Sequence, residues 1–355
     1  MLKVIATLTC ALCMTLLQAQ TVITPIGQEI AISEIETFVK NQMELTGTPG
    51  ISLAFVNDGK VVYELNTGKS APDKEVTKQT IFEGASLSKP LFAYFTMKLV
   101  EKEILNLDTP LHTYLPYADI AHDERYKKIT ARMVLSHQTG FPNWRTDSPG
   151  EDLFLNFEPG TGFEYSGEGY QYLALVLQQL TGTNPSGLQE LFEKDVSGPL
   201  GMTRTRFIQN DAIMDNKALA FKKGSWEELN DFGSDEFGAA YGIHSSAGDF
   251  AKWLVALMQK KGLSGESFRE LFSHQVALPE DNPNREFGIT NVTLGFFTGQ
   301  FPFGTLYGHG GNNDKRFTSL FIIIPESNWG MVLFTNSGFG EELGLGLLQF
   351  LTNPG

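Results

Sequence analysis

The stretch Ile81-Phe82-Glu83-Gly84-Ala85-Ser86-Leu87-Ser88-Lys89-Pro90, residues 81–90, decides how the rest of this sequence is interpreted. Its first three residues are expected to end a strand, and Gly84-Ala85 to turn the chain tightly into a helix. Proline is tolerated in the first turn of a helix but costs about 3 kcal/mol in its interior. Pro90 therefore places the helix start near Ser86, and the apolar positions extend the helix to about Glu101.

Ser86 and Lys89 form an S-x-x-K pattern that occurs once in the chain. Side chains three residues apart share one face of a helix. A serine hydroxyl becomes a strong nucleophile when a neighbouring base removes its proton, and a neutral lysine one turn away can be that base. The free amides at a helix N-terminus can also stabilise a negatively charged oxygen. Because the pattern alone also fits a capping serine followed by a surface lysine, other motifs have to decide.

Two further motifs accompany this pattern. Phe163-Glu164-Tyr165-Ser166-Gly167 follows a Glu-Pro-Gly turn, and Gly308-His309-Gly310-Gly311-Asn312-Asn313 precedes a strongly apolar strand. Together the three resemble the motifs S-x-x-K, Y-x-N and K-T-G or H-x-G of the serine β-lactamase and penicillin-binding-protein family. The branch that the chain resembles holds class C β-lactamases, D,D-carboxypeptidases, D-aminopeptidases and related esterases. The resemblance extends from about Glu34 to Phe350 and includes the connecting segments 135–140, 198–202 and 245–249.

The resemblance implies a role for the first two motifs. Ser86 would attack a carbonyl to form an acyl-enzyme, and Lys89 would be its general base. Tyr165 would carry protons to the leaving group and help to activate water. An unperturbed lysine has a pKa of about 10.4, so desolvation or nearby positive charge would have to lower the pKa of Lys89. Without the motif, Tyr165 would be taken for a core residue.

The third motif would form the opposite wall of the site. The resemblance implies that the backbone amides of Ser86 and Asn312 form an oxyanion hole. Gly310 and Gly311 would leave the strand edge bare for pairing with the substrate backbone, although a β-bulge or a turn would also explain two glycines. His309 stands where K-T-G has lysine. It could hydrogen-bond a substrate carboxylate or tune the tyrosine, most effectively when protonated.

One position departs from the family pattern, because Gly167 replaces the asparagine of Y-x-N. That asparagine typically contacts the substrate amide and the catalytic lysine, and glycine can do neither. The sequence therefore favours a D-peptidase, carboxypeptidase or esterase over a true class C-like β-lactamase, and predicts that Gly167→Asn raises β-lactam turnover. The alternative from another class is a penicillin-binding or cell-wall-sensing protein with little turnover.

Four aromatic residues before the third motif could rim an apolar acyl pocket or fill a sheet core: Phe296, Phe297, Phe301 and Phe303.

The resemblance implies an α/β (α+β) fold of the β-lactamase/transpeptidase-like type, in which an antiparallel sheet flanked by helices lies beside an all-helical lobe. Residues 21–355 would form a single β-lactamase-like catalytic domain. Its α/β lobe would take in roughly residues 30–85 and 240–355, and its helical lobe roughly residues 86–239. The active site would lie in the groove between the two lobes.

Local patterns predict the elements of this fold. Ser33 with Glu36, and Ser246 with Asp249, are capping boxes that open helices. Alternating or unbroken apolar runs predict strands, and the periodicity of 3.6 residues predicts helices. The predicted strands are Ile51–Val56 and Val61–Leu65, joined by an Asn-Asp-Gly-Lys hairpin turn, and Phe317–Ile324 and Trp329–Thr335; the predicted helices are Tyr170–Leu180 and Leu343–Leu351.

The first twenty residues fit a secretory signal peptide. Lys3 is followed by the uncharged apolar run Val4–Leu17, which is too short for a stop-transfer helix. An uncleaved anchor is the alternative. Both cysteines, Cys10 and Cys13, lie inside this segment, so the mature chain would contain neither a disulfide nor a thiolate metal site. We expect a periplasmic or secreted bacterial protein.

Composition and charge exclude several classes of partner. The chain has 355 residues, of which 41% are hydrophobic and 19% charged, with a formal net charge of −14. An acidic surface disfavours nucleic acids and anionic membranes. The expected partner is a small-molecule or peptide substrate, without nucleic acid or stable membrane insertion, and the sequence leaves the oligomeric state open. Because the sequence has neither H-E-x-x-H nor G-x-S-x-G, we expect no metal and no organic cofactor, and no α/β-hydrolase.

Overall fold

The computed structural model of the protein describes residues 20–147, 152–230 and 235–353. Apart from Gln20, the predicted signal peptide lies outside these residues, as do both cysteines. Within the described ranges, no helix combines the length and the hydropathy that are needed to cross a membrane.

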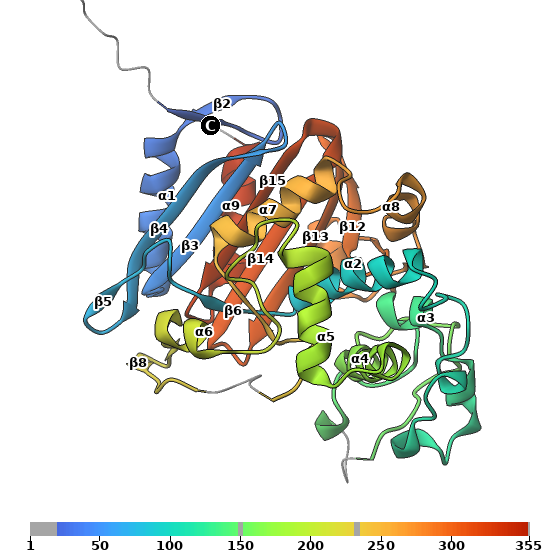
Figure 1. Ribbon diagram of the computed structural model, residues 1–355. Coiled ribbons are helices and arrows are strands. Elements are labelled where there is room, and N and C mark those ends of the chain that lie inside the picture. Colours follow the sequence, from blue (N-terminus) through green and yellow to red (C-terminus); the bar gives the residue numbers. More distant parts are fainter. Residues whose placement is uncertain (1–19, 148–151, 231–234, 354–355) are drawn as a thin grey trace, which may run out of the picture.

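A nine-stranded antiparallel sheet forms the centre of the molecule (Figure 1). Its strand order is β10-β11-β12-β13-β14-β15-β3-β4-β5, so strands from the two ends of the chain meet where β15 pairs with β3. The strands are β3 (Gly50–Asn57), β4 (Lys60–Ala71), β5 (Lys74–Glu75), β10 (Val276–Ala277), β11 (Asn291–Val292), β12 (Phe297–Phe301), β13 (Gly304–Asn313), β14 (Phe317–Ile324) and β15 (Trp329–Thr335).

The central strands form where the apolar runs predict them. All residues of β3, β14 and β15 are buried, as expected for strands that are covered on both faces. Asp58 and Gly59 join β3 to β4 with φ angles of 48° and 67°. Positive φ at both central residues is the requirement of the tight hairpin turn that Asp-Gly favours, so the predicted hairpin is confirmed.

Helices cover both faces of the sheet. Alternate side chains of a strand point to opposite faces. Leu53 packs in the cluster that includes α1 (Ile32–Thr46) and α9 (Gly340–Thr352), whereas Ala54 packs in the cluster that includes α7 (Ala247–Met258). The predicted helices at 170–180 and 343–351 are confirmed, each a few residues longer than expected.

The middle of the chain consists mainly of helices and loops and lies beside the sheet, in teal and green in Figure 1. Its central helix, α2 (Ser88–Glu101), has 11 of its 14 residues buried, which explains why it carries apolar residues on every side. The other α-helices of the described chain are α3 (Ala131–Leu135), α4 (Gly167–Thr181), α5 (Pro185–Phe192), α6 (Asp211–Asn216) and α8 (Gly265–Leu271). The boundaries of the two predicted lobes stay a prediction.

Shorter elements complete the described chain. The strands β6 and β9 pair with each other, as do β1 with β2 and β7 with β8. These strands are β1 (Thr21–Ile23), β2 (Glu29–Ala31), β6 (Phe82–Ala85), β7 (Phe221–Lys222), β8 (Ser225–Trp226) and β9 (Ile243–Ser245). The 3-10 helices are η1 (Leu111–Thr113), η2 (Ala118–Ile120), η3 (Glu124–Lys128), η4 (Arg145–Asp147), η6 (Pro283–Phe287) and η7 (Pro325–Ser327), and η5 (Glu193–Ser197) is a π-helix.

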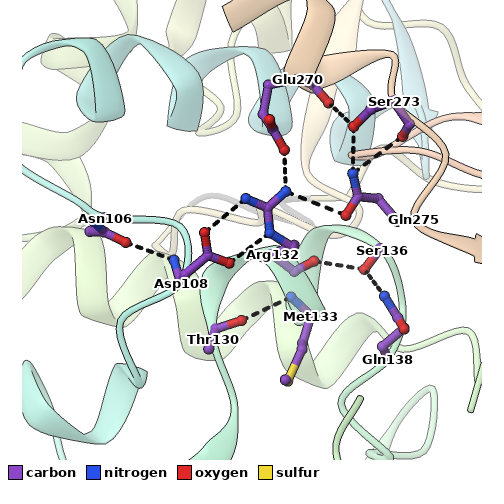
Figure 2. A network of polar contacts seen from close by, with 10 residues as sticks. All are labelled: Asn106, Asp108, Thr130, Arg132, Met133, Ser136, Gln138, Glu270, Ser273 and Gln275. Carbon is purple, nitrogen blue, oxygen red and sulfur yellow. Dashed lines mark hydrogen bonds and ion pairs between the residues drawn. The ribbon is translucent and has the colours of Figure 1, made fainter. Parts of the chain in front are cut away.

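A polar network anchors α3 to the elements around it (Figure 2). The Arg132 guanidinium donates hydrogen bonds to Asp108, at 2.7 and 2.8 Å, and pairs with Glu270 of α8. The Ser136 hydroxyl donates to the Arg132 carbonyl at 2.7 Å and closes the end of the helix. The network therefore fixes the segment that leads from α3 to His137.

Candidate active site

Ser86 lies in the turn between β6 and α2. The helix begins at Ser88, two residues after the predicted start, so Ser86 precedes its first turn. Ala85 has a φ of 49°, a conformation that is uncommon for a residue with a side chain. The Ser88 hydroxyl holds it there by donating to the Ala85 carbonyl at 2.6 Å and accepting from the Ile243 amide at 2.9 Å. The second serine of the motif is therefore structural.

Lys89 points at Ser86 from the first turn of α2. Its side-chain Nζ donates hydrogen bonds to Ser86 Oγ at 3.2 Å and to the Ala240 carbonyl at 2.9 Å. The residue is 1% exposed, and burial lowers the pKa of Lys89 from 10.5 to about 7. Because a large fraction of Lys89 is then neutral near pH 7, it can accept a proton from the serine.

Tyr165 is the third polar side chain of the site, beside Ser86 and Lys89. Lys89 Nζ lies 4.6 Å from the centroid of its ring. Burial raises the pKa of Tyr165 above its ordinary value, and a hydrogen bond with Ser86 acts in the opposite direction. Tyr165 therefore carries its phenolic proton at neutral pH, which allows it to donate.

His309 lies on β13 and is almost fully buried. Its Nδ1 is 2.5 Å from the Gly310 carbonyl oxygen, which can only accept, so Nδ1 carries the proton. Burial, with a smaller contribution from the charge of Lys89, lowers the pKa of His309 to about 3. The imidazole is therefore neutral at ordinary pH. A neutral imidazole can still form hydrogen bonds, and the role of His309 toward a substrate carboxylate or toward Tyr165 stays a prediction.

The glycines of the third motif allow close packing. A Cβ on Gly311 would overlap Ser319 Oγ and the Gly84 carbonyl, so glycine lets β13 approach β6 next to Ser86. A Cβ on Gly310 would lie 2.6 Å from Glu341 Oε1. The register between β13 and β14 is continuous here, which excludes the alternative of a β-bulge in this pair. The side chain of Asn312 accepts the Lys315 amide at 2.7 Å and shapes the following turn.

A single cavity of about 1760 Å³ brings the sequence-predicted residues together. All seven line it: Ser86, Lys89, Tyr165, His309, Gly310, Gly311 and Asn312. Of the four aromatic candidates, Phe297, Phe301 and Phe303 line the cavity, whereas Phe296 is buried against Trp253 and Phe321 in the core. Among the described residues, no group of three or more His, Cys, Asp or Glu is arranged to hold a metal ion.

His137 packs against Tyr165 from behind the cavity, and no sequence motif assigned it a role. Its Nδ1 accepts a hydrogen bond from the Ser166 amide at 3.1 Å, and its ring lies 4.5 Å from the ring of Tyr165. It has a φ of 60° and is 1% exposed, and burial holds the pKa of His137 well below its ordinary value. A neutral His137 therefore fixes the backbone beside Tyr165. The sequence did offer one signal for His137, because the residue lies in the segment 135–140 that resembles the family.

Trp144 is the second residue that the sequence did not single out. A Cβ built on Gly167 would lie 2.5 to 2.9 Å from three atoms of the Trp144 ring. The indole thus occupies the space into which an asparagine side chain at position 167 would extend. No spacing rule connects these two residues in the sequence.

Comparison with known proteins identifies the family. A family model described as Beta-lactamase matches residues 35–350 of the chain. Protein flp of Staphylococcus aureus (strain MRSA252) is 25% identical over 334 residues, which cover 85% of this chain and 62% of that protein. The chain thus spans less than two thirds of the length of this relative.

Two solved structures share the fold. The octameric penicillin-binding protein homologue from Pyrococcus abyssi gives a TM-score of 0.75 at 24% identity, over 90% of this chain and 78% of that one. The D-alanine carboxypeptidase AmpC from Burkholderia cenocepacia gives 0.74 at 19% identity, over 90% and 99%. These likenesses confirm the predicted fold class. Because the family model covers residues 35–350, the chain belongs to the Beta-lactamase family.

Proposed function

We propose that this protein is a serine hydrolase that cleaves amide or ester bonds in a small-molecule or peptide substrate through an acyl-enzyme. The observation that carries the proposal is the hydrogen bond of 3.2 Å between Lys89 Nζ and Ser86 Oγ, in surroundings that lower the pKa of Lys89 to about 7. A serine paired with a largely neutral base is an activated nucleophile.

The acylation step uses groups that already lie together. Neutral Lys89 takes the proton of Ser86, and Ser86 Oγ forms a bond to the substrate carbonyl carbon. The backbone amides of Ser86 and Asn312 hold the oxyanion. When the tetrahedral intermediate collapses, the bond to the leaving group breaks, and Tyr165 passes a proton to the departing nitrogen or oxygen. Water then attacks the acyl carbon and gives one proton to the Tyr165 phenolate. The bond between the acyl carbon and Ser86 Oγ breaks as Lys89 returns its proton to Oγ, so the acid is released and both groups regain their starting protonation states.

Peptidase or esterase chemistry is favoured over β-lactam hydrolysis. The Trp144 indole lies where the asparagine of the family motif would extend, and Gly167 offers no side-chain amide in its place. A β-lactamase would need another group to contact the amide of the substrate. The name of the Burkholderia cenocepacia protein, a D-alanine carboxypeptidase, supports an amide-cleaving candidate within this fold.

The test is release of p-nitrophenol from p-nitrophenyl acetate by the purified protein and its Ser86→Ala variant. We expect steady turnover that the substitution lowers by at least about a thousandfold. Ser225→Ala is the matched control, because Ser225 is exposed, does not line the cavity and donates only to the Lys222 carbonyl. Equal turnover in wild type and Ser86→Ala would remove Ser86 from the nucleophile role. A single burst without steady turnover would support the penicillin-binding alternative instead.

A further inference from the structure

We propose that Trp144 is a specificity-determining residue, which contacts an aromatic or other flat apolar group of the substrate. The inference rests on the proposed function and adds to it a class of substrate. It is carried by the placement of the indole, by the bonds that hold it there and by the cavity into which it projects.

The first step is the contact between Trp144 and Gly167. The indole atoms Cη2, Cζ2 and Cζ3 would lie 2.5, 2.7 and 2.9 Å from a Cβ on Gly167. Such distances are far inside van der Waals contact, so any side chain at position 167 would displace the ring. Gly167 is the first residue of α4 and stands two residues after Tyr165. The absent side chain therefore lets the indole rest on the backbone beside the proposed catalytic tyrosine.

The second step is that both neighbours of Trp144 in the chain are tied to α4. The Gly167 amide donates to Asn143 Oδ1 at 3.1 Å and to the Asn143 carbonyl at 3.0 Å. The Arg145 guanidinium donates to both oxygens of Glu168, at 3.0 and 2.9 Å, and the Glu168 side chain is only 7% exposed. A bidentate pair of this kind has a defined geometry, and its carboxylate is largely buried. The backbone at Trp144 is therefore held in place before any substrate binds, which lowers the entropy cost of binding to the indole.

The third step is the cavity that the indole lines. Trp144 is partly exposed and lines the same cavity as Ser86 and Lys89, and it also borders a smaller hollow on the side of Arg145 and Glu168. The Tyr241 ring lies 5.8 Å from it at 71° and lines the cavity as well. Tyr241 follows Ala240, whose carbonyl accepts the hydrogen bond from Lys89. An edge-to-face aromatic pair beside the reacting groups presents a flat apolar wall, to which a ring or a broad apolar group of the substrate binds best.

The experiment measures aromatic preference with the leaving group held constant. We define this preference as kcat/KM for p-nitrophenyl phenylacetate divided by kcat/KM for p-nitrophenyl acetate. Trp144→Ala is expected to lower it about two- to tenfold, since the substitution removes the pairing of the indole with the aromatic ring of the substrate. Trp144→Phe should retain most of it. The matched control is Trp226→Ala, which removes a partly exposed indole that does not line the cavity.

A second pair of esters tests whether the aromatic group lies in the leaving group of the substrate rather than in its acyl group. Benzyl acetate and ethyl acetate share the acyl group, so a fall in their ratio in Trp144→Ala would place the aromatic group in the leaving group. A fall in either ratio supports the inference, and unchanged ratios in both series overturn it. If Trp144→Ala does not fold, Gly167→Ala displaces the indole without removing it and is expected to lower the same ratio. Absence of turnover in the wild type would instead overturn the proposed function, and this inference with it.

Discussion

At the scale of single residues, the protonation state of Lys89 controls the proposed chemistry. Burial lowers the pKa of Lys89 to about 7, and it raises the pKa of Tyr165 above its ordinary value. The base is therefore lost as the pH falls below about 7, whereas Tyr165 keeps its proton well into the alkaline range. Of the two groups, only Lys89 changes its charge near neutral pH.

We therefore expect kcat/KM to rise with pH through about 7 and then to reach a plateau. At pH 6 about a tenth of Lys89 would be neutral, which predicts a rate about tenfold below the plateau at pH 8.5. The measurement is a pH profile of p-nitrophenyl ester hydrolysis, with the non-enzymatic rate subtracted at each pH. A profile that is flat between pH 5.5 and 8.5 would contradict the role of Lys89 as general base.

The structure changes the prediction for Gly167→Asn. The sequence alone predicts a rise in β-lactam turnover, but an asparagine here would collide with Trp144. We now expect the single substitution to lower stability without raising turnover. The double variant Trp144→Ala/Gly167→Asn, which has space for the amide, should exceed it in turnover. Hydrolysis of a chromogenic cephalosporin measures the turnover of both variants, and denaturant titration measures their stability. A rise in the single variant with the indole in place would show that Trp144 does not obstruct position 167.

At the scale of elements, the approach of β13 to β6 positions the site. Gly311 allows this approach, because a Cβ there would overlap Gly84 of β6 and Ser319 of β14. Gly311→Ala should therefore push β13 away from Ser86, lowering the free energy of unfolding by about 1–3 kcal/mol and activity more than tenfold. Denaturant titration and ester hydrolysis measure the two effects.

Gly265→Ala in α8 is the control for this substitution, because Gly265 is exposed and does not line the cavity. Its Cβ would have Arg269 Nη1 as nearest neighbour at 3.7 Å, which is an ordinary contact. Alanine is more favourable than glycine in a helix, so stability should not fall and activity should not change. Equal effects of the two substitutions would mean that the contact between β13 and β6 does not position the site.

The two predicted capping boxes show how far local patterns reach. Ser246 caps α7 as predicted, and its side chain accepts the Asp249 amide at 3.4 Å. The prediction at Ser33 is wrong, because α1 begins at Ile32 and its N-cap is Ala31, without a side-chain bond. β2 pairs with β1 up to Ala31, so the end of this strand determines where the helix begins. A tertiary contact here prevailed over a local capping preference.

At the scale of the whole molecule, motif order and apolar runs predicted the sheet, its central hairpins and the convergence of three distant motifs. These features follow from residues that are close in sequence or from a shared pattern. The roles of His137 and Trp144 could not be predicted in this way. Each depends on contacts with residues more than 20 positions away, Ser166 and Gly167, which no local periodicity connects. The packing of Phe296 in the core, apart from its aromatic neighbours, depends likewise on tertiary contacts.

The central claim is that Ser86 carries the acyl group, and mass spectrometry tests it most directly. The wild-type protein would be mixed with p-nitrophenyl acetate, quenched in acid within the first turnovers and analysed intact and after digestion. We predict a mass increase of one acetyl group on the peptide that contains Ser86, which is absent from Ser86→Ala. Steady hydrolysis with no adduct, or an adduct on another residue that persists in Ser86→Ala, would contradict the account.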